Sequence, residues 1–242
     1  MKTQYAVILV AGEGKRLKPF TDSAPKCMVE VHGISILENA LSLFAQNGVT
    51  TSRIVVGHLS SVIRQYFGLS FKNMNIEYIE NNIYESTNSM YSLYLGLQGI
   101  HEPTWVLEGD VFFEYAVLTN PVREDIAWFV DAKRKDLDGA YIMFDDQNRA
   151  LSLEIIRDLK NLPNQCGKSI GLLHLNPKGL DYFRKWLQQG VNVHQEKLYY
   201  DLVVGPHFCE AKIEIVDVGG QKWFEIDTYA DMENAQKLFS QE

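Results

Sequence analysis

The sequence predicts a three-layer α/β fold in which helices cover both faces of a mostly parallel, mixed sheet. Three observations support this prediction. The run Tyr5–Ala11 is continuously apolar, as in a strand that is buried on both faces of a sheet. Apolar runs then alternate with helical patterns as far as residue 107. After about residue 125 the pattern becomes strand-rich, which indicates antiparallel additions to the sheet.

The first half of the chain alternates short apolar runs with amphipathic segments. The expected strands cover residues 5–11, 53–57, 76–80 and 104–107. The expected helices cover residues 36–47, 62–67 and 90–97. Ser35 and Glu38 form a capping box at the start of the first helix, and Gly48 ends it. Strands that alternate with helices imply right-handed crossovers and therefore a mostly parallel sheet.

The second half is expected to add strands to this sheet and to close with a helix. The strands cover residues 126–130, 140–144, 150–156, 169–175, 212–218 and 223–226. Asn176 and Pro177 begin a helix that Gly190 ends, and Thr228 caps the closing helix. No linker or internal repeat is visible, so we expect residues 1–242 to form one domain.

Composition and charge limit the class of protein. The 242 residues are 46% hydrophobic and 22% charged, which is ordinary for a globular protein and excludes a disordered chain. The formal net charge is −8 and no Lys/Arg-rich stripe is present, so we expect no nucleic-acid partner. No apolar stretch approaches the roughly 20 residues that span a bilayer, and we expect a soluble, cytoplasmic protein without membrane insertion. Three widely spaced cysteines indicate neither a disulfide framework nor a zinc site.

The most informative segment is the glycine-containing loop after the first strand. Gly12 and Gly14 allow the backbone to approach a ligand closely and to direct N–H groups at phosphate oxygens. The planar guanidinium of Arg16 suits bidentate phosphate binding, and Lys26 provides a compact charge for a transferring phosphoryl group. Leu17 stands where a dinucleotide fingerprint needs a small residue, and no Walker sequence is present. The alternative is a plain strand-to-helix turn with surface cations.

The run LVAGEGKRLKPFTDSAPK resembles the amino-terminal signature of the sugar-phosphate nucleotidyltransferase superfamily, which joins nucleoside triphosphates to phosphorylated small molecules. The segment after it also resembles these enzymes, although Ser35 stands where they often have proline. Segments 91–94, 108–110 and 224–227 are similar to the phosphocholine cytidylyltransferase branch. The resemblance covers essentially the whole chain and implies a Rossmann-like nucleotidyltransferase fold. The expected parts are a nucleotide-binding part over about 1–111, an acceptor-binding part over about 112–227 and a closing helix over 228–242.

Two aspartates are the candidate magnesium ligands. Asp110 and Asp227 each follow an apolar strand, at the sheet edge where open α/β sheets bind ligands. Two phosphorylated substrates bring several negative charges together, and Mg²⁺ with oxygen ligands makes this approach tolerable. The resemblance matches both aspartates to the family's metal ligands, with Glu108 and Glu225 as reserve ligands or supporting groups. A helix cap is the alternative for Asp227.

The resemblance implies nucleotidyl transfer without a covalent enzyme intermediate. An oxygen of the acceptor's phosphate attacks the α-phosphorus in line, and pyrophosphate leaves opposite. Arg16 is assigned to the β and γ phosphates, Lys26 to the α-phosphate and the incoming phosphate, and Asp110 and Asp227 to Mg²⁺. These four residues form the predicted catalytic set. Loss of one cation is expected to slow the reaction on the order of 10²- to 10³-fold.

The nucleotide is expected to lie on the glycine loop. The predicted nucleotide-binding residues are Leu9, Ala11, Gly12, Gly14, Arg16, Lys26, Asn81, Asn88 and Ser92. Loop backbone groups and bordering polar side chains would read the base, because a wrong base leaves buried polar groups unpaired. The segment 87–95 is most similar to the cytidylyltransferase branch, which favours CTP. For Asn81, a turn role is as compatible with the sequence as a base contact.

The acceptor is less closely defined. The predicted acceptor-binding residues are Lys26, Tyr199, Tyr200 and Asp201, and further aromatic candidates are Trp128, Tyr141 and Trp223. Segment 198–201 resembles one that contributes to a choline pocket in that branch, and choline needs aromatic faces and a carboxylate. Core positions are the alternative for the aromatic residues. Segment 131–139 lacks the tryptophan expected from the choline enzymes, so other phosphorylated amines, amino acids, alditols or sugars stay open.

The first hypothesis is therefore Mg²⁺-dependent transfer of CMP from CTP to a small phosphorylated acceptor, phosphocholine or a related phospho-amine or phosphonate. One alternative is a sugar-1-phosphate nucleotidyltransferase that uses UTP, dTTP or GTP. Another is a non-catalytic, nucleotide-binding regulatory protein. Because a sensor could dispense with metal ligands, the presence of Asp110 and Asp227 beside the two cations argues against it. The sequence leaves the oligomeric state open.

Overall fold

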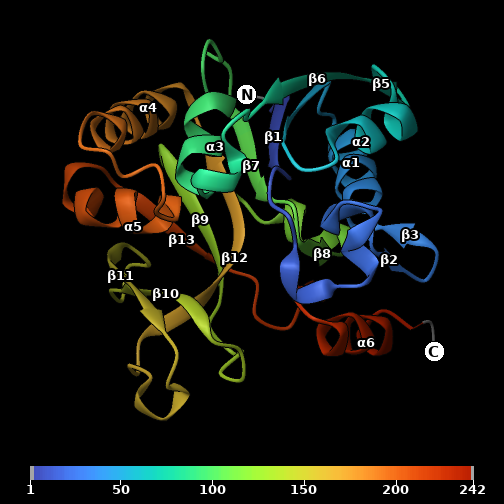
Figure 1. Ribbon diagram of the computed structural model, residues 1–242. Coiled ribbons are helices and arrows are strands. Elements are labelled where there is room, and N and C mark those ends of the chain that lie inside the picture. Colours follow the sequence, from blue (N-terminus) through green and yellow to red (C-terminus); the bar gives the residue numbers. More distant parts are fainter. Residues whose placement is uncertain (1–2, 241–242) are drawn as a thin grey trace.

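The computed structural model describes residues 3–240, and its central layer is a ten-stranded mixed sheet (Figure 1). The strands of this sheet are β1 (Tyr5–Leu9), β4 (Thr51–Val56), β5 (Ser70–Phe71), β6 (Met74–Glu80), β7 (Thr104–Glu108), β9 (Ile126–Asp131), β10 (Gly139–Phe144), β11 (Ala150–Ile156), β12 (Cys166–Leu175) and β13 (Ile213–Asp217). Two small ribbons accompany it, β2 (Glu30–Val31) with β3 (Ile34–Ser35), and β8 (Val111–Phe113) with β14 (Trp223–Glu225).

The centre of the sheet is parallel and its margin is antiparallel. Strand β1 pairs in parallel with β4 and β7, and β6 continues in parallel beyond β4. Strand β12 pairs antiparallel with β7, β9 and β10, and β11 follows β10. Strand β13 returns in parallel beside β9. The predicted α/β class is confirmed, and the antiparallel additions come from the strand-rich second half of the sequence.

Helices cover both faces of the sheet. They are α1 (Ile36–Asn47), α2 (Ser60–Phe67), α3 (Ser89–Gly96), α4 (Pro177–Asn192), α5 (Tyr200–Val204) and α6 (Tyr229–Leu238). Buried side chains of α1 and α2 pack on one face, and those of α3, α4 and α5 on the other. Strand residues alternate between faces, so Ala6 and Ile8 contact the first layer of helices and Val7 and Leu9 the second. No helix within residues 3–240 has the length and apolarity to cross a membrane.

The predicted capping residues begin three of these helices. The Ser35 hydroxyl accepts a hydrogen bond from the backbone N–H of Glu38 at 3.1 Å. The Asn176 side chain caps α4, and Thr228 forms a capping box with Asp231 at the start of α6. Helix α5 was not predicted, because its five residues are too few to show a helical period.

The β8–β14 ribbon was also not predicted as a pair. The two strands run antiparallel, with Glu225 opposite Val111. Phe112 and Phe224 pack with α6 in a small core of their own, so the ribbon is anchored by apolar contacts. The ribbon therefore sets the positions of the residues that follow β7 and of those that follow β14.

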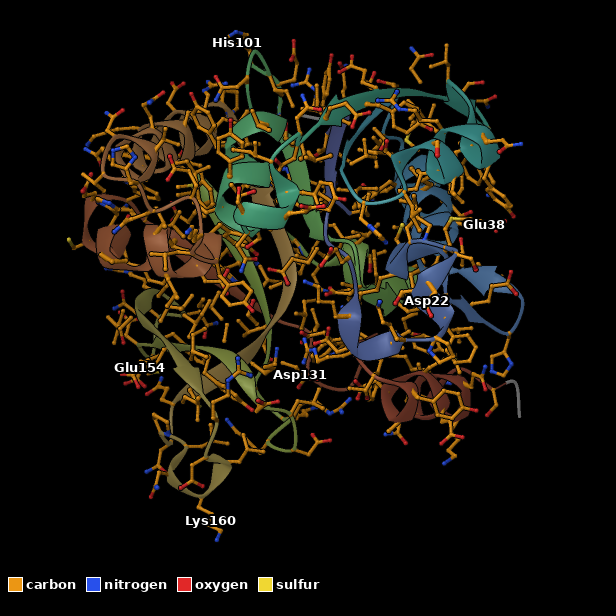
Figure 2. All side chains as sticks on the ribbon, viewed as in Figure 1. Asp22, Glu38, His101, Asp131, Glu154 and Lys160 are labelled. Carbon is orange, nitrogen blue, oxygen red and sulfur yellow. The ribbon has the colours of Figure 1, made fainter. Side chains whose placement is uncertain are left out.

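Strands β10 and β11 form a hairpin at the antiparallel margin (Figure 1). Figure 2 shows Lys160, on the connection from β11 to β12, at the outer end of this margin. Residues at the inner end of the hairpin, Gly139 and Ile155 among them, line a cavity next to the strand ends of the parallel sheet. The hairpin therefore supplies one wall of a site.

Candidate active site

The glycine loop leaves the end of β1 at the centre of the sheet. Gly14 has a φ of 63°, in the left-handed region that favours glycine. A Cβ atom on Gly14 would lie 2.8 Å from the Cβ of Lys26, so glycine also permits the close approach of the lysine segment. The Thr21 hydroxyl donates to the Gly14 carbonyl at 3.0 Å and holds the loop in this shape.

Two cations and two carboxylates meet beside this loop. The Lys26 ammonium donates to Oδ2 of Asp110 at 2.8 Å and also to Oδ1 of Asp227. A guanidinium nitrogen of Arg16 lies 2.7 Å from Oδ2 of Asp227. The structure thus brings together the four residues of the predicted catalytic set, although Arg16 and Asp227 are 211 positions apart in the chain.

Mutual attraction controls the charge of this cluster. Burial acts to lower the pKa of Lys26, but its attraction to Asp110 and Asp227 is larger, and the pKa is raised. Burial acts to raise the pKa of Asp227, but the charges of Lys26 and Arg16 outweigh it, and the pKa is lowered. Both residues are therefore charged at neutral pH.

The β8–β14 ribbon explains how two distant aspartates come to share one lysine. Asp110 lies between β7 and β8, and Asp227 follows β14. The backbone N–H of Ile226 donates to the Asp110 carbonyl at 2.9 Å, which extends the ribbon pairing by one step. The two aspartates are therefore held on adjacent chains at one end of the ribbon.

Three carboxylates at this place have the geometry to hold a metal ion. Asp110, Glu225 and Asp227 each offer an oxygen, and these oxygens all lie within 4.8 Å of one another. The Oδ1 atom of Asp110 is buried and has no hydrogen-bond partner among residues 3–240. Because Mg²⁺ prefers oxygen ligands and an orphaned carboxylate oxygen is costly, this donor set fits Mg²⁺.

A cavity of about 470 Å³ opens beside the glycine loop, and we call it the loop cavity. All the sequence-predicted nucleotide-binding residues line it, namely Leu9, Ala11, Gly12, Gly14, Arg16, Lys26, Asn81, Asn88 and Ser92. Asp110 and Asp227 also line this cavity. A ligand on the glycine loop would therefore have one end at the cation and carboxylate cluster.

Two of the lining asparagines have structural partners of their own. The Asn81 amide donates to the hydroxyls of Thr87 and Ser92, at 3.1 Å each, and its oxygen accepts from the backbone N–H of Ile83. The Asn88 oxygen accepts from the backbone N–H of Ser89 and caps α3. Asn81 therefore has a turn role and Asn88 a cap role, which are the alternatives to a base contact. The Ser92 hydroxyl, which Asn81 orients, keeps its own hydrogen for a ligand.

A second cavity, of about 320 Å³, lies on the other side of the cluster, and we call it the acid cavity. The two cavities share five lining residues, so the two spaces meet at the cluster; these residues are Arg16, Glu108, Asp110, Tyr199 and Asp227. Tyr199 and Asp201, two of the predicted acceptor residues, line the acid cavity. Lys26 lines the loop cavity only.

Tyr200 does not have the position expected of it. Its side chain is fully buried, its ring centroid lies 6.0 Å from that of Trp128, and it lines neither cavity. The reason is local, because neighbouring residues at the start of α5 point in different directions. Trp128, Tyr141 and Trp223 are also buried and line neither cavity, which agrees with the alternative that they belong to the core. Of the predicted acceptor residues, only Tyr200 is therefore misplaced, and the other three rings occupy the core positions that the sequence analysis gave as their alternative.

The acid cavity contains a buried ionic group that the sequence analysis only partly found. Glu108, Asp201 and Glu225 line it together with Lys168, whose side chain is 4% exposed. The Lys168 ammonium donates to Glu225 at 2.9 Å and to the Ser169 carbonyl at 3.0 Å. Lys168 was missed, although a lone lysine within the otherwise uncharged strand β12 was a visible signal.

Burial and crowding weaken the acidity of these carboxyl groups. Burial, then repulsion from Asp201, Asp110 and Glu225, raises the pKa of Glu108 well above its usual value. Burial raises the pKa of Asp201 to about 6, although Lys168 opposes this. Burial also raises the pKa of Glu225, again against the attraction of Lys168. One ammonium therefore does not compensate three carboxyl groups.

Comparison with known proteins places these features in a family context. The family model described as nucleotidyl transferase matches residues 5–150. A CMP-5'-(3-aminopropyl)phosphonate synthase from Streptomyces rubellomurinus is 29% identical over 97% of this chain, which spans only 38% of that protein. Two further relatives align over nearly their full lengths. They are the choline-phosphate cytidylyltransferase of Streptococcus pneumoniae (24% identical, 98% of this chain and 99% of the relative) and the 2-aminoethylphosphonate cytidylyltransferase of Lancefieldella rimae (24%, 94% and 89%).

Solved structures show the same fold. The CTP:phosphocholine cytidylyltransferase of Streptococcus pneumoniae superposes with a TM-score of 0.79 at 20% identity, and covers 98% of this chain and 100% of that chain. The inositol-1-phosphate CTP transferase of T. maritima superposes with a TM-score of 0.75 at 21% identity, covering 98% and 97%. The Rossmann-like nucleotidyltransferase architecture expected from the sequence is thereby confirmed.

Proposed function

Because this chain belongs to the nucleotidyl transferase family, we propose that it transfers CMP from CTP to a small phosphorylated acceptor and releases pyrophosphate. The acceptor class is phosphocholine or a related phospho-amine or phosphonate, as in the names of the similar cytidylyltransferases. The observation that carries the proposal is the Lys26–Asp110–Asp227 cluster, which lies where the loop cavity and the acid cavity adjoin. A nucleotide in one cavity and an acceptor in the other would meet there.

The reaction requires charge stabilisation more than proton transfer. A phosphate oxygen of the acceptor forms a bond to the α-phosphorus of CTP, and the bond from that phosphorus to the pyrophosphate oxygen breaks. The acceptor phosphate is already ionised near neutral pH, so no general base is needed. Lys26 would contact the α-phosphate and the attacking phosphate, and Arg16 the departing phosphates, because both cations lie at the cluster.

Asp110, Glu225 and Asp227 would hold a magnesium ion at the cluster. When bound, Mg²⁺ neutralises negative charge between two phosphorylated substrates. Lys26 contacts both Asp110 and Asp227, and Arg16 contacts Asp227, so these cations hold the two carboxylates close together.

The nucleotide would lie in the loop cavity, with backbone groups of the glycine loop close to the base and phosphates. The Ser92 hydroxyl, held by Asn81, is the side-chain group best placed to select the base. The preference for CTP over other nucleotides is supported by the cytidylyltransferases among the similar proteins.

Pyrophosphate release over a matrix of substrates tests this function. CTP, UTP, dTTP and GTP, each with Mg²⁺, are crossed with phosphocholine, phosphoethanolamine, aminoethylphosphonate, glycerol phosphate and sugar 1-phosphates. We expect turnover with CTP and a phosphorylated amine or phosphonate. Turnover only with UTP, dTTP or GTP and a sugar 1-phosphate would overturn the choice of base and acceptor. Binding of CTP without turnover of any acceptor would indicate the regulatory alternative.

Two lysines of similar position in the chain make a matched pair for the same assay. Lys26→Met removes the ammonium that bridges the aspartates, and we expect turnover to fall on the order of 10²- to 10³-fold. Lys18→Met removes an exposed lysine that lines neither cavity, and turnover should stay within about twofold of the parent. Undiminished turnover of the Lys26 variant would refute the assigned role.

A further inference from the structure

The acid cavity contains a carboxylate that lacks a partner. Asp201 is only 8% exposed, and its Oδ1 atom has no hydrogen-bond partner among the described residues. The residue lines the cavity together with Glu108 and Glu225. A buried carboxylate oxygen without a donor is costly, so this atom indicates a ligand that brings an N–H or O–H group.

The backbone is shaped around these acidic side chains. Strand β12 has a register shift between Ser169 and Leu173, and Gly171 within it has a φ of 71°. A Cβ atom on Gly171 would lie 3.2 Å from a carboxylate oxygen of Glu108. The bulge therefore makes room for the Glu108 carboxyl group, which indicates a built site rather than a chance gathering of acids.

The charge of the cavity favours a cation. Lys168 is the one ammonium deep in the cavity among the described residues, and Glu225 already holds it at 2.9 Å. Glu108 and Asp201 remain without a cation of their own. A positively charged ligand would therefore be attracted to them, and its arrival would compensate the excess of acid groups.

The walls of the cavity distinguish between kinds of cation. Quaternary ammonium groups have no N–H and are recognised through aromatic faces. Among the described residues that line this cavity, Tyr199 is the only aromatic one, and its ring is 47% exposed. Carboxylate oxygens instead need hydrogen-bond donors, which a trimethylammonium group lacks.

We propose that the acceptor carries an ammonium group with N–H hydrogens, and that Glu108 and Asp201 bind it in the acid cavity and discriminate against trimethylammonium. This inference rests on the proposed function and narrows its acceptor to phosphorylated or phosphonylated amines such as phosphoethanolamine. The phosphorus group of such an acceptor would point to the cluster that the two cavities share, with its amine toward Asp201.

Calorimetry with four probes tests the proposal independently of turnover. Phosphoethanolamine and its N-methyl and N,N-dimethyl derivatives lose N–H groups stepwise, and phosphocholine has none. We expect affinity to fall along this series, by on the order of 10- to 100-fold in total. Phosphocholine binding as tightly as phosphoethanolamine would overturn the proposal. Because turnover with CTP is measured separately, a failure of the proposed function would remain distinguishable.

Variants of nearly unchanged shape locate the effect. Asp201→Asn and Glu108→Gln should each raise the Kd for phosphoethanolamine at least about tenfold, because each replaces a carboxyl group that can pair with an ammonium by an amide that cannot ionise. The Kd for glycerol phosphate, which has no ammonium, should stay within about twofold in Asp201→Asn, whereas a general loss of structure would change both. The exposed Glu124→Gln is the matched control and should bind every probe as the parent does. Equal losses for both probes in the Asp201 variant would overturn the assignment.

Discussion

The Lys26 side chain is 15% exposed, and its ammonium group contacts carboxylates from two distant parts of the chain. Without this ammonium, Asp110 and Asp227 would repel each other in a partly buried place. Lys26 therefore has a structural effect on the site in addition to the role proposed for it in catalysis. The type of residue was evident from the sequence, but its simultaneous contact with both aspartates was not.

The fold keeps the His174 side chain neutral, whereas it keeps Lys26 charged. It shares a hydrogen bond of 2.9 Å with the Thr3 hydroxyl, and its ring packs on Trp105. Burial lowers the pKa of His174 to about 4 from an ordinary 6.5. These partners give His174 a structural role in the core.

The shifted pKa of His174 predicts a loss of stability in acid. The unfolded chain takes up a proton near pH 6.5 and the folded protein only near pH 4, so the stabilisation is complete above pH 6.5 and is lost as the pH falls toward 4. The loss amounts to about 3 kcal/mol. Denaturant unfolding at pH 7.5 and at pH 4 measures this loss. Between these pH values, the free energy of unfolding should fall by about 3 kcal/mol less in His174→Gln than in the parent.

The exposed His101 provides the matched control, His101→Gln, for the loss of an imidazole. Figure 2 shows His101 on a loop at the edge of the molecule. If the His174 variant and the parent lose stability in parallel over this pH range, the burial of a neutral imidazole is not what limits acid stability.

At the scale of elements, the β8–β14 ribbon decides the geometry of the site. Each strand has only three residues, which is too short a segment for its residue pattern to indicate a pairing. The pairing depends on Phe112 and Phe224, which find apolar partners only when α6 and the loop residue Leu17 pack against them. Short strands of this kind are stabilised by tertiary contacts, so local pattern does not reveal them.

The turn between β7 and β8 gives a sharp test of this geometry. A Cβ atom on Gly109 would lie 2.3 Å from a Val10 methyl carbon and 2.5 Å from the Leu9 carbonyl oxygen. We expect Gly109→Ala to lower the free energy of unfolding by about 1–3 kcal/mol and to reduce turnover, because Asp110 must shift with the backbone. Urea unfolding and the pyrophosphate assay measure the two effects.

Gly12→Ala is the matched control for this change. An ideal Cβ there has no atom within 4 Å, so the free energy of unfolding should change by less than about 0.5 kcal/mol. Because Gly12 lines the loop cavity, nucleotide affinity is the property expected to weaken. Equal destabilisation by both substitutions would contradict the steric argument for Gly109.

At the scale of the whole molecule, the two cavities and the cluster between them lie at the ends of strands that come from different parts of the chain. The glycine loop follows β1, Asp110 follows β7, and the hairpin β10–β11 adds the outer wall. Parallel strands end at one edge of the sheet, which gathers these loops in a single region. The proposed substrates would therefore meet where several loops converge.

This arrangement predicts that CTP and Mg²⁺ bind with positive coupling. Lys26 and Arg16 now occupy oxygens of Asp110 and Asp227, and nucleotide phosphates would attract both cations away from them. The freed carboxylates would then bind Mg²⁺ more tightly. We expect the Kd for CTP to fall at least about tenfold when EDTA is replaced by Mg²⁺, as measured by calorimetry.

In the Asp110→Asn variant, Mg²⁺ should lower the Kd for CTP much less than in the parent. The reason is that an amide is a weaker metal ligand than a carboxylate and binds Lys26 less strongly. The exposed Asp22→Asn, which lines neither cavity, should respond to Mg²⁺ as the parent does. A Kd for CTP that is the same with EDTA and with Mg²⁺ would contradict the coupling and the proposed metal site together.

The sequence by itself determined the features that depend on local chemistry. Continuous apolar runs, capping residues and the glycine loop with Arg16 and Lys26 indicated the fold class and the family, and the family model matches residues 5–150. Carboxylates after strands predict Asp110 and Asp227 as magnesium ligands, and this role stays a prediction. Each of these features depends on residues that are close together in the chain, where spacing translates directly into geometry.

Only the tertiary structure decided which distant groups meet. It placed Glu225 with the two aspartates, set Lys168 against Glu225, and turned Tyr200 into the core while Tyr199 stayed at a cavity wall. These outcomes depend on how strands far apart in the sequence pair and on which side of a short helix packs inward. Such choices are made by the competition for buried apolar area across the whole molecule, which no local segment contains.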